Sequence, residues 1–293
     1  MAQVQANGIT IEYEEAGDGD PLLLVMGLNG QLIDWPSGLV DALVAEGFRV
    51  IRFDNRDAGL STEFAGPAPT MWALARTALL RTRMRAAYSL ADMADDAVAL
   101  LDALGVEQAH VAGMSMGGMI AQRIAIDHPQ RVLSLTSIMS TTGNVRVGRP
   151  KARVIAHVAR RKPVGPEGAI EPAVELFRMV SGSTFSDEQF RELAATSIAR
   201  SYRPAGTARQ LAAILAAPDR TAELRKLDVP TLVIHGSMDP LVRPSGGLAT
   251  AAAVPGARLL MFNDMGHDLP HTRWAEIATA IRQNANRAVP APT

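Results

Sequence analysis

The sequence predicts an α/β protein in which helices cover both faces of a mostly parallel β-sheet. Short apolar runs, typical of strands buried on both faces, alternate along the chain with longer segments of helical spacing. The 293 residues suffice for one large core, because cores stop growing at about 250–300 residues. Cysteine is absent, which excludes disulfides, thiolate metal sites and cysteine nucleophiles.

Five strands are expected in the first half of the chain, with helices between them. Residues 9–15 alternate apolar and polar side chains and predict a strand at a sheet edge, whereas the continuous apolar run 21–26 predicts a buried strand. The helices end where glycine or proline interrupts their spacing. The remaining strands are expected at 48–53, 109–113 and 132–139, and the helices at 35–47, 90–104 and 117–128.

The alternation of strands and helices lapses between residues 142 and 227. This stretch has helical patches at 172–180, 187–199 and 207–215 but no convincing buried strand. The strand pattern then resumes at 230–235 and 257–262, and a last helix is expected at 273–285. The sequence therefore predicts a core made of 1–141 and 228–287, a helical cap over 142–227, and a disordered Pro/Ala-rich tail at 288–293.

The charge balance argues against a general nucleic-acid binder, because the net charge is only -1. Basic residues nevertheless gather in segments 76–85 and 146–162, where a basic amphipathic helix would rest weakly on an anionic lipid surface or cover a pocket mouth. A solvated charged face is the alternative. No export signal is visible over residues 1–8, so a cytoplasmic protein is expected, and its oligomeric state stays open.

The strongest local signal for chemistry is Gly113-Met114-Ser115-Met116-Gly117. It lies between an expected strand and an expected helix, which is the context that gives the G-x-S-x-G pattern its meaning. Small flanking residues allow the sharp turn, and the turn lifts the Ser115 hydroxyl out of the sheet. The glycine spacing does not fit a dinucleotide-binding loop. Ser115 is therefore predicted to be a nucleophile.

A serine nucleophile needs a base, and the base needs an orienting acid. Asp239 follows the strand 230–235 in a loop, and His267 follows the next strand after a glycine, so the chain order is Ser, Asp, His. Asp264 and Asp268 flank His267 and are competing candidates for the acid, but neighbours in sequence seldom face one another. His235 falls inside a strand and is expected to be structural, whereas the histidines that lack convergent partners are expected to be structural or to lie at the surface.

Neither a metal ion nor a cofactor is expected. His267 and His271 are four residues apart, but Pro270 lies between them and excludes a zinc-binding helix.

An oxyanion hole needs two backbone N–H donors. Met116, directly after the nucleophile, is expected to supply one, and Leu28, in the turn after strand 21–26, the other. Apolar residues next to these groups predict a pocket for an uncharged ester, with ordinary core packing as the alternative for any one of them. The predicted lining residues are Met26, Asn29, Trp35, Met114, Met139, Leu241 and Leu269, and Trp72 is a further candidate.

These motifs together resemble the α/β-hydrolase superfamily, and within it the small bacterial carboxylesterases and lipases of the aclacinomycin methyl esterase type. The resemblance is carried by Met26-Gly27-Leu28, by the segment 54–61 (DNRDAGLS), by Gly113-Met114-Ser115-Met116-Gly117, by the segment 235–239 (HGSMD), and by Gly266-His267. It implies an eight-stranded, mostly parallel sheet with a helical cap inserted after the sixth strand. It also implies ester hydrolysis through an acyl-enzyme.

The chain departs from many relatives at two places, where it has Met26-Gly27 instead of His-Gly and Arg56-Asp57-Ala58-Gly59 instead of Arg-Gly-x-Gly. A serine nucleophile argues against haloalkane dehalogenase and epoxide hydrolase chemistry. The function expected first is a serine carboxylic-ester hydrolase. A lipase or thioesterase working at lipid surfaces, a perhydrolase with the same triad, and a catalytically silent binding protein are the alternatives.

Overall fold

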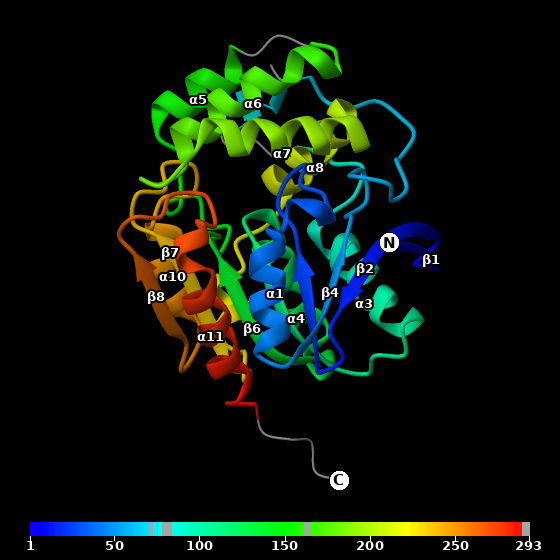
Figure 1. The fold of residues 1–293 in the computed structure, drawn as a ribbon, viewed down its shortest axis with the longest axis vertical. Coiled ribbons are helices and arrows are strands. Elements are labelled where there is room, and N and C mark those ends of the chain that lie inside the picture. Colours follow the sequence, from blue (N-terminus) through cyan, green and yellow to red (C-terminus); the bar gives the residue numbers. More distant parts are fainter. Residues whose placement is uncertain (71–72, 75, 78–83, 161–163, 289–293) are drawn as a thin grey trace.

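The computed structural model describes residues 1–70, 73–74, 76–77, 84–160 and 164–288. Its centre is an eight-stranded sheet with the order β1-β2-β4-β3-β5-β6-β7-β8 (Figure 1). β2 runs antiparallel to both of its neighbours, and every other pairing is parallel. The strands are β1 (Ala2–Ala6), β2 (Ile9–Ala16), β3 (Asp20–Val25), β4 (Phe48–Phe53), β5 (Ala109–Met114), β6 (Val132–Ile138), β7 (Thr231–Gly236) and β8 (Arg258–Phe262).

Helices cover both faces of the sheet. The helices of the core are α1 (Ser37–Ala45), α3 (Leu90–Ala103), α4 (Met116–Asp127), α9 (Thr221–Leu224), α10 (Ser245–Ala253) and α11 (Trp274–Ala285). Short 3-10 turns are η1 (Leu32–Asp34), η2 (Pro129–Arg131) and η3 (His271–Arg273). The doubly covered, mostly parallel sheet predicted from the sequence is confirmed.

The central strand β3 shows why both faces must be covered. Successive side chains of a strand point to opposite faces. Leu23 and Val25 accordingly join the core under α3 and α4, while Leu22 and Leu24 join a second core under α1 and α11. All four side chains are almost completely buried. A continuous apolar run is therefore what this strand requires.

Between β6 and α9, the described residues form four further helices. These inserted helices are α5 (Ala152–Ala159), α6 (Pro166–Val180), α7 (Asp187–Arg200) and α8 (Pro204–Ala216). Figure 1 shows them stacked over one end of the sheet. None of the helices in the described part of the chain has the length and apolarity needed to cross a bilayer.

The prediction that 9–15 forms the edge strand is wrong, because β1 pairs outside β2. β1 is mostly polar and exposed, so it carries no apolar run that would reveal it. The signal that predicts it is the turn Asn7-Gly8, where both residues have positive φ, 49° and 74°. That combination is the requirement of a tight hairpin turn, and Asn-Gly is its preferred sequence.

Candidate active site

Ser115 lies on the sharp turn between β5 and α4. Its φ of 57° and ψ of -119° belong to a backbone region that residues with a side chain seldom adopt. The Ser115 N–H donates to the Ile138 carbonyl at 2.8 Å, and the Ser115 carbonyl accepts from the Ser140 hydroxyl at 2.8 Å. Contacts on both sides thus hold this half-buried serine in its unusual conformation.

The two glycines of the motif are explained by close packing. A Cβ atom on Gly113 would overlap the Gly117 carbonyl, and a Cβ atom on Gly117 would overlap the Val25 carbonyl of β3. The strand before Ser115, the helix after it and the neighbouring strand therefore approach one another as closely as their backbones allow. Only glycine fits at either position.

Asp239 and His267 meet through a short hydrogen bond. Asp239 follows β7, His267 follows β8, and the His267 Nδ1 atom lies 2.7 Å from Asp239 Oδ2. The other carboxylate oxygen, Oδ1, accepts the N–H groups of Leu241 and Val242 at 2.8 and 2.9 Å. Both side chains are buried. The parallel strands β5, β7 and β8 thus carry Ser115, Asp239 and His267 at the same edge of the sheet.

The surroundings of Asp239 favour its ionised form. Burial alone would raise the pKa of this carboxyl group, but the charge of His267 and the hydrogen bonds from His235 and His267 outweigh burial and lower the pKa. An ionised carboxylate only accepts hydrogen bonds, so His267 Nδ1 must carry the proton. Nε2 of His267 is then the basic nitrogen.

His235 is buried within β7 beside this pair. Its Nε2 atom lies 2.7 Å from the Val242 carbonyl and 3.5 Å from Asp239 Oδ2. Since both partners are acceptors, Nε2 is the protonated nitrogen of this ring. The His235 ring thus ties the strand to the loop that carries the aspartate.

The two competing carboxylates are engaged elsewhere. Asp264 pairs with Arg273 at 3.0 Å. Asp268 Oδ1 accepts the N–H groups of Gly182 and Gly266 at 3.0 and 2.9 Å, and burial raises the pKa of its carboxyl group. Within the described residues, no cluster of three or more histidine, cysteine, aspartate or glutamate side chains is arranged to hold a metal ion.

The turn after β3 lies directly against the serine. A Cβ atom on Gly27 would be 3.2 Å from Ser115 Cβ and 3.7 Å from Ser115 Oγ. Met116 is the first residue of α4, where a helix leaves its N–H groups without partners inside the helix. The two backbone segments expected to supply oxyanion donors therefore flank Ser115.

The residues predicted to line a pocket fall into three groups. Met26, Trp35 and Met139 are buried members of one core cluster. Met114 and Leu269 are partly buried and pack against the same cluster, while Leu241 is half-buried in the Asp239 loop. Asn29 is exposed and bonded to α8. Trp72 lies outside the described residues.

Sequence reasoning missed the residues of the inserted helices that grip the core. Arg200 binds Asp54 at 2.7 Å, and Arg209 binds both carboxylate oxygens of Asp57 at 2.8 Å. Gln210, also buried, bonds the turn after β3. Each contact joins residues more than 140 positions apart in the chain, so no local sequence pattern predicts it.

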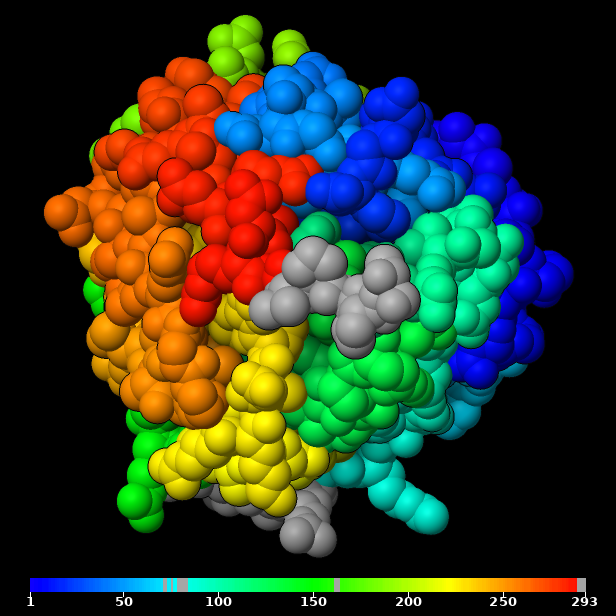
Figure 2. All heavy atoms as spheres, turned by 90° about the horizontal axis from the view of Figure 1, so that it is seen from below, coloured from blue at the N-terminus to red at the C-terminus, as the bar shows by residue number. Residues whose placement is uncertain are grey.

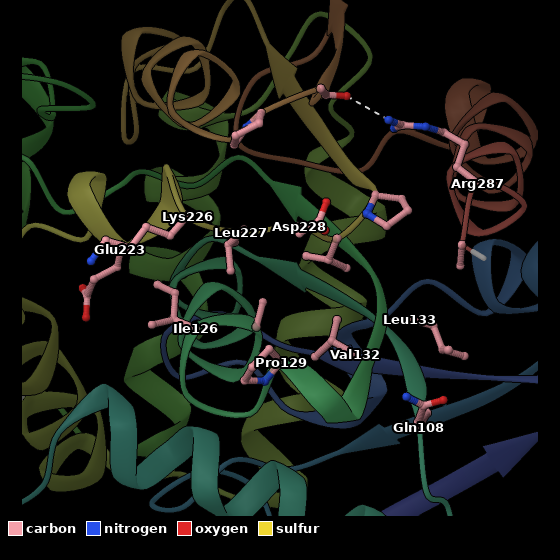
Figure 3. A pocket seen from close by; sticks show the side chains of 16 residues that line it. Gln108, Ile126, Pro129, Val132, Leu133, Glu223, Lys226, Leu227, Asp228 and Arg287 are labelled. Atoms are coloured by element: carbon pink, nitrogen blue, oxygen red, sulfur yellow. Dashed lines mark hydrogen bonds between the residues drawn. The ribbon is translucent and has the colours of Figure 1, made fainter. Parts of the chain in front are cut away.

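A cavity of about 1030 Å³ lies far from these groups (Figure 3). Its walls include Gln108, Val132 and Pro230, which stand immediately before or at the start of strands, and Gly256, two residues before β8. Figure 2 looks onto this end of the molecule, where the green, yellow, orange and red parts of the chain meet. Ligands of parallel sheets bind at the opposite, carboxyl ends of the strands. The cavity is therefore not the candidate active site.

A family comparison agrees with this architecture. Residues 20–273 match the model of the family described as alpha/beta hydrolase fold. The chain belongs to the α/β hydrolase fold family. The resemblance inferred from the motifs is thus confirmed, and the chain is a hydrolase of this fold.

Relatives of the hydrolase act on several kinds of substrate. It is 32% identical to rhodomycin D methylesterase of Streptomyces sp. strain C5, over 93% of this chain and 94% of that one. It is 29% identical to 2-hydroxymuconate semialdehyde hydrolase of Pseudomonas sp. strain CF600, over 96% and 89%. The solved thermophilic esterase of Thermogutta terrifontis superposes with a TM-score of 0.73 at 25% identity, over 98% of both chains.

Proposed function

We propose that the hydrolase cleaves an apolar small-molecule carboxylic ester through an acyl-enzyme on Ser115. The observation that carries the proposal is the short, buried bond between His267 Nδ1 and Asp239 Oδ2, set at the same sheet edge as the strained Ser115. That bond leaves His267 Nε2 as a base. A pure binding protein has no need of such a base.

In the proposed mechanism, Ser115 Oγ attacks the ester carbonyl carbon while its proton passes to His267 Nε2. The tetrahedral intermediate collapses, the C–O bond to the alcohol breaks, and His267 returns the proton to the departing alcohol oxygen. Water then attacks the acyl-enzyme with His267 as the base again, which releases the carboxylic acid and restores Ser115. Asp239 keeps the proton on His267 Nδ1 and stabilises the imidazolium that forms when Nε2 takes up a proton.

The developing oxyanion would be held by the N–H groups of Leu28 and Met116. The Leu28 N–H belongs to the turn that packs against Ser115, and the Met116 N–H opens α4, where the helix dipole also favours negative charge. Loss of one such donor costs about 100- to 1,000-fold in kcat in comparable enzymes.

An apolar ester is favoured by the residues around the site. Met26 and Met139 directly follow the strands β3 and β6, Met114 ends the strand β5 between them, and all three belong to or pack against one apolar cluster. The similarity to a methylesterase supports a methyl ester of a larger apolar acid as the substrate class. The small leaving group would then be methanol.

Covalent labelling tests the proposal. The folded parent protein is expected to react with a fluorophosphonate probe, whereas Ser115→Ala should not, and Ser183→Ala, which removes an exposed serine, should label like the parent. Hydrolysis of p-nitrophenyl esters and of aryl methyl esters would then rank the acyl and alcohol parts. Asp239→Asn should lower kcat by about 10,000-fold. A folded parent that neither labels nor hydrolyses any ester would overturn the proposal.

A further inference from the structure

Gln210 on α8 makes two hydrogen bonds that join the inserted helices to the active-site end of the sheet. Its Oε1 accepts the N–H of Asn29 at 2.8 Å, and its Nε2 donates to the Arg56 carbonyl at 2.8 Å. One partner is a donor and the other an acceptor, so only one orientation of the side-chain amide satisfies both. The side chain is fully buried, so water does not replace either bond.

Asn29 is the third residue of the turn that places the proposed oxyanion donor. The Gly30 N–H donates to the Gly27 carbonyl at 3.1 Å, which closes a turn over residues 27–30. Asn29 has a φ of 62°, the feature that defines the third position of a type II turn. The bond from its N–H to Gln210 fixes the orientation of the peptide between Leu28 and Asn29.

The direction of the Leu28 N–H follows from this turn. A peptide unit is planar, with its C=O and N–H pointing in opposite directions. The Gly27 carbonyl points into the turn toward Gly30, so the Leu28 N–H of the same peptide points away from it. A change in the turn would therefore redirect this donor.

Helix α8 is seated firmly enough to impose this geometry. Arg209, next to Gln210, binds both oxygens of the buried Asp57 carboxylate. Gly206 approaches Asp57 so closely that a Cβ atom would overlap the Asp57 carbonyl. Thr207, on the same helix, donates its hydroxyl proton to the side chain of Asn29. These contacts fix the position of α8 on the core, and therefore the position of Gln210.

We infer that Gln210 is a positioning residue for the oxyanion hole, so that the hole takes its working geometry only when α8 is seated on the core. This inference rests on the proposed esterase function for its kinetic consequence but not for its structural one. The inserted helices thereby do more than cover the site, because one of them sets the catalytic geometry beneath it.

Gln210→Met tests the inference, since methionine keeps the size of the side chain and removes both hydrogen bonds. Gln122→Met is the matched control: Gln122 is equally buried and also bonded at both ends, to Ser137 and Arg220, but it lies inside α4. Both variants lose two buried bonds, so both should show a lowered Tm. Only Gln210→Met should alter the turn over residues 27–30.

For Gln210→Met, kcat for p-nitrophenyl butyrate should fall by about 10- to 100-fold, which is the effect expected when one oxyanion donor is weakened. KM should change less than about three-fold. The inhibition constant of an alkyl trifluoromethyl ketone, whose adduct carries the oxyanion, should rise by the same factor as kcat/KM falls. Gln210→Glu, which keeps an oxygen for the Asn29 N–H, should retain more kcat than Gln210→Met.

Hydrogen exchange of the peptide covering residues 26–31 provides a readout without turnover. Exchange there should be faster in Gln210→Met and unchanged in Gln122→Met. Parental exchange in this peptide, or parental kcat in a folded Gln210→Met, would overturn the inference. An inactive parent with faster exchange in Gln210→Met would instead overturn only the proposed function.

Discussion

At the scale of single residues, the backbone around Ser115 leaves no room for a side chain at position 117. We expect Gly117→Ala to lower the free energy of unfolding by about 2–3 kcal/mol, because the new methyl group would press on the Val25 carbonyl of β3. Urea denaturation measures this loss. Gly165→Ala is the control, since a Cβ atom there meets nothing within 4 Å. Equal stability of both variants would contradict the packing argument.

Asp34 gives the fold a predictable dependence on pH. Burial raises the pKa of its carboxyl group to about 6, although hydrogen bonds from the Gln31 N–H and the Ser197 hydroxyl oppose the shift. The folded state therefore binds a proton that the unfolded chain has released, and stability falls as pH rises from about 4 to 6. Asp34→Asn removes this titration, so its stability relative to the parent should rise by about 3 kcal/mol between pH 4 and pH 6.

The difference in unfolding free energy between Asp34→Asn and the parent should grow between pH 4 and 6 and then level off. Asp41→Asn, which changes an exposed aspartate of α1, should give a small and constant difference. A difference for Asp34→Asn that does not change with pH would contradict the raised pKa of Asp34 in the folded state.

The residues of the proposed triad are visible in the sequence because each one is marked locally. Ser115 stands between two glycines, and Asp239 and His267 follow apolar runs that predict strands. Gln210 carries no such mark, since its partners Asn29 and Arg56 are more than 150 residues away. Its role depends on how α8 docks, and docking is a property of the folded chain.

At the scale of elements, buried strands were predicted well and exposed or weakly patterned elements poorly. The strand 48–53 was predicted to the residue, because both faces of β4 are apolar or half-buried. The sequence did not predict β1, because this strand is polar. It did not predict α10 either, because the sequence SGGLATAAA has no apolar stripe. Apolar periodicity indicates that one face of a helix or strand is buried. Elements without this periodicity can be predicted only from the turn residues beside them.

The basic segment around α5 leads to a prediction about membranes. α5 exposes Ile155 beside cations that form no ion pair within the described residues. These cations are Arg146, Arg149, Lys151, Arg153 and Arg160, whereas Arg161 and Lys162, like Arg81 and Arg83 of the other basic segment, lie outside the described residues. An anionic lipid surface attracts each nearby cation by about 1 kcal/mol.

We therefore expect the hydrolase to bind phosphatidylserine-containing vesicles at low salt. It should not bind neutral phosphatidylcholine vesicles. The double change Arg153→Gln, Arg160→Gln should weaken co-sedimentation by at least 10-fold, on the order of two lost cations. Arg191→Gln is the control, because Arg191 is already paired with Glu171. Binding that ignores these charges, or salt, would refute a lipid-facing role.

At the scale of the whole molecule, the parallel topology decides where function resides. β3, β5, β7 and β8 all run in one direction, so the loops that follow them meet at a single edge of the sheet. That edge carries Gly27, Ser115, Asp239 and His267, and the inserted helices bond to it. The order of motifs along the chain predicted this meeting, while the seating of the inserted helices on segment 54–61 depended on long-range arginine pairs.

The same topology makes the cavity at the opposite end a test of the assignment. Leu133→Trp would fill part of that cavity and should leave kcat/KM for p-nitrophenyl butyrate within about two-fold of the parent. Leu241→Trp adds the same bulk next to Asp239 and should lower kcat/KM by 10-fold or more, because the predicted substrate pocket loses space there. A strong loss in Leu133→Trp with parental activity in Leu241→Trp would move the active site to the other end of the sheet. Both variants replace a leucine with a tryptophan, so any general effect of that substitution on stability appears in both.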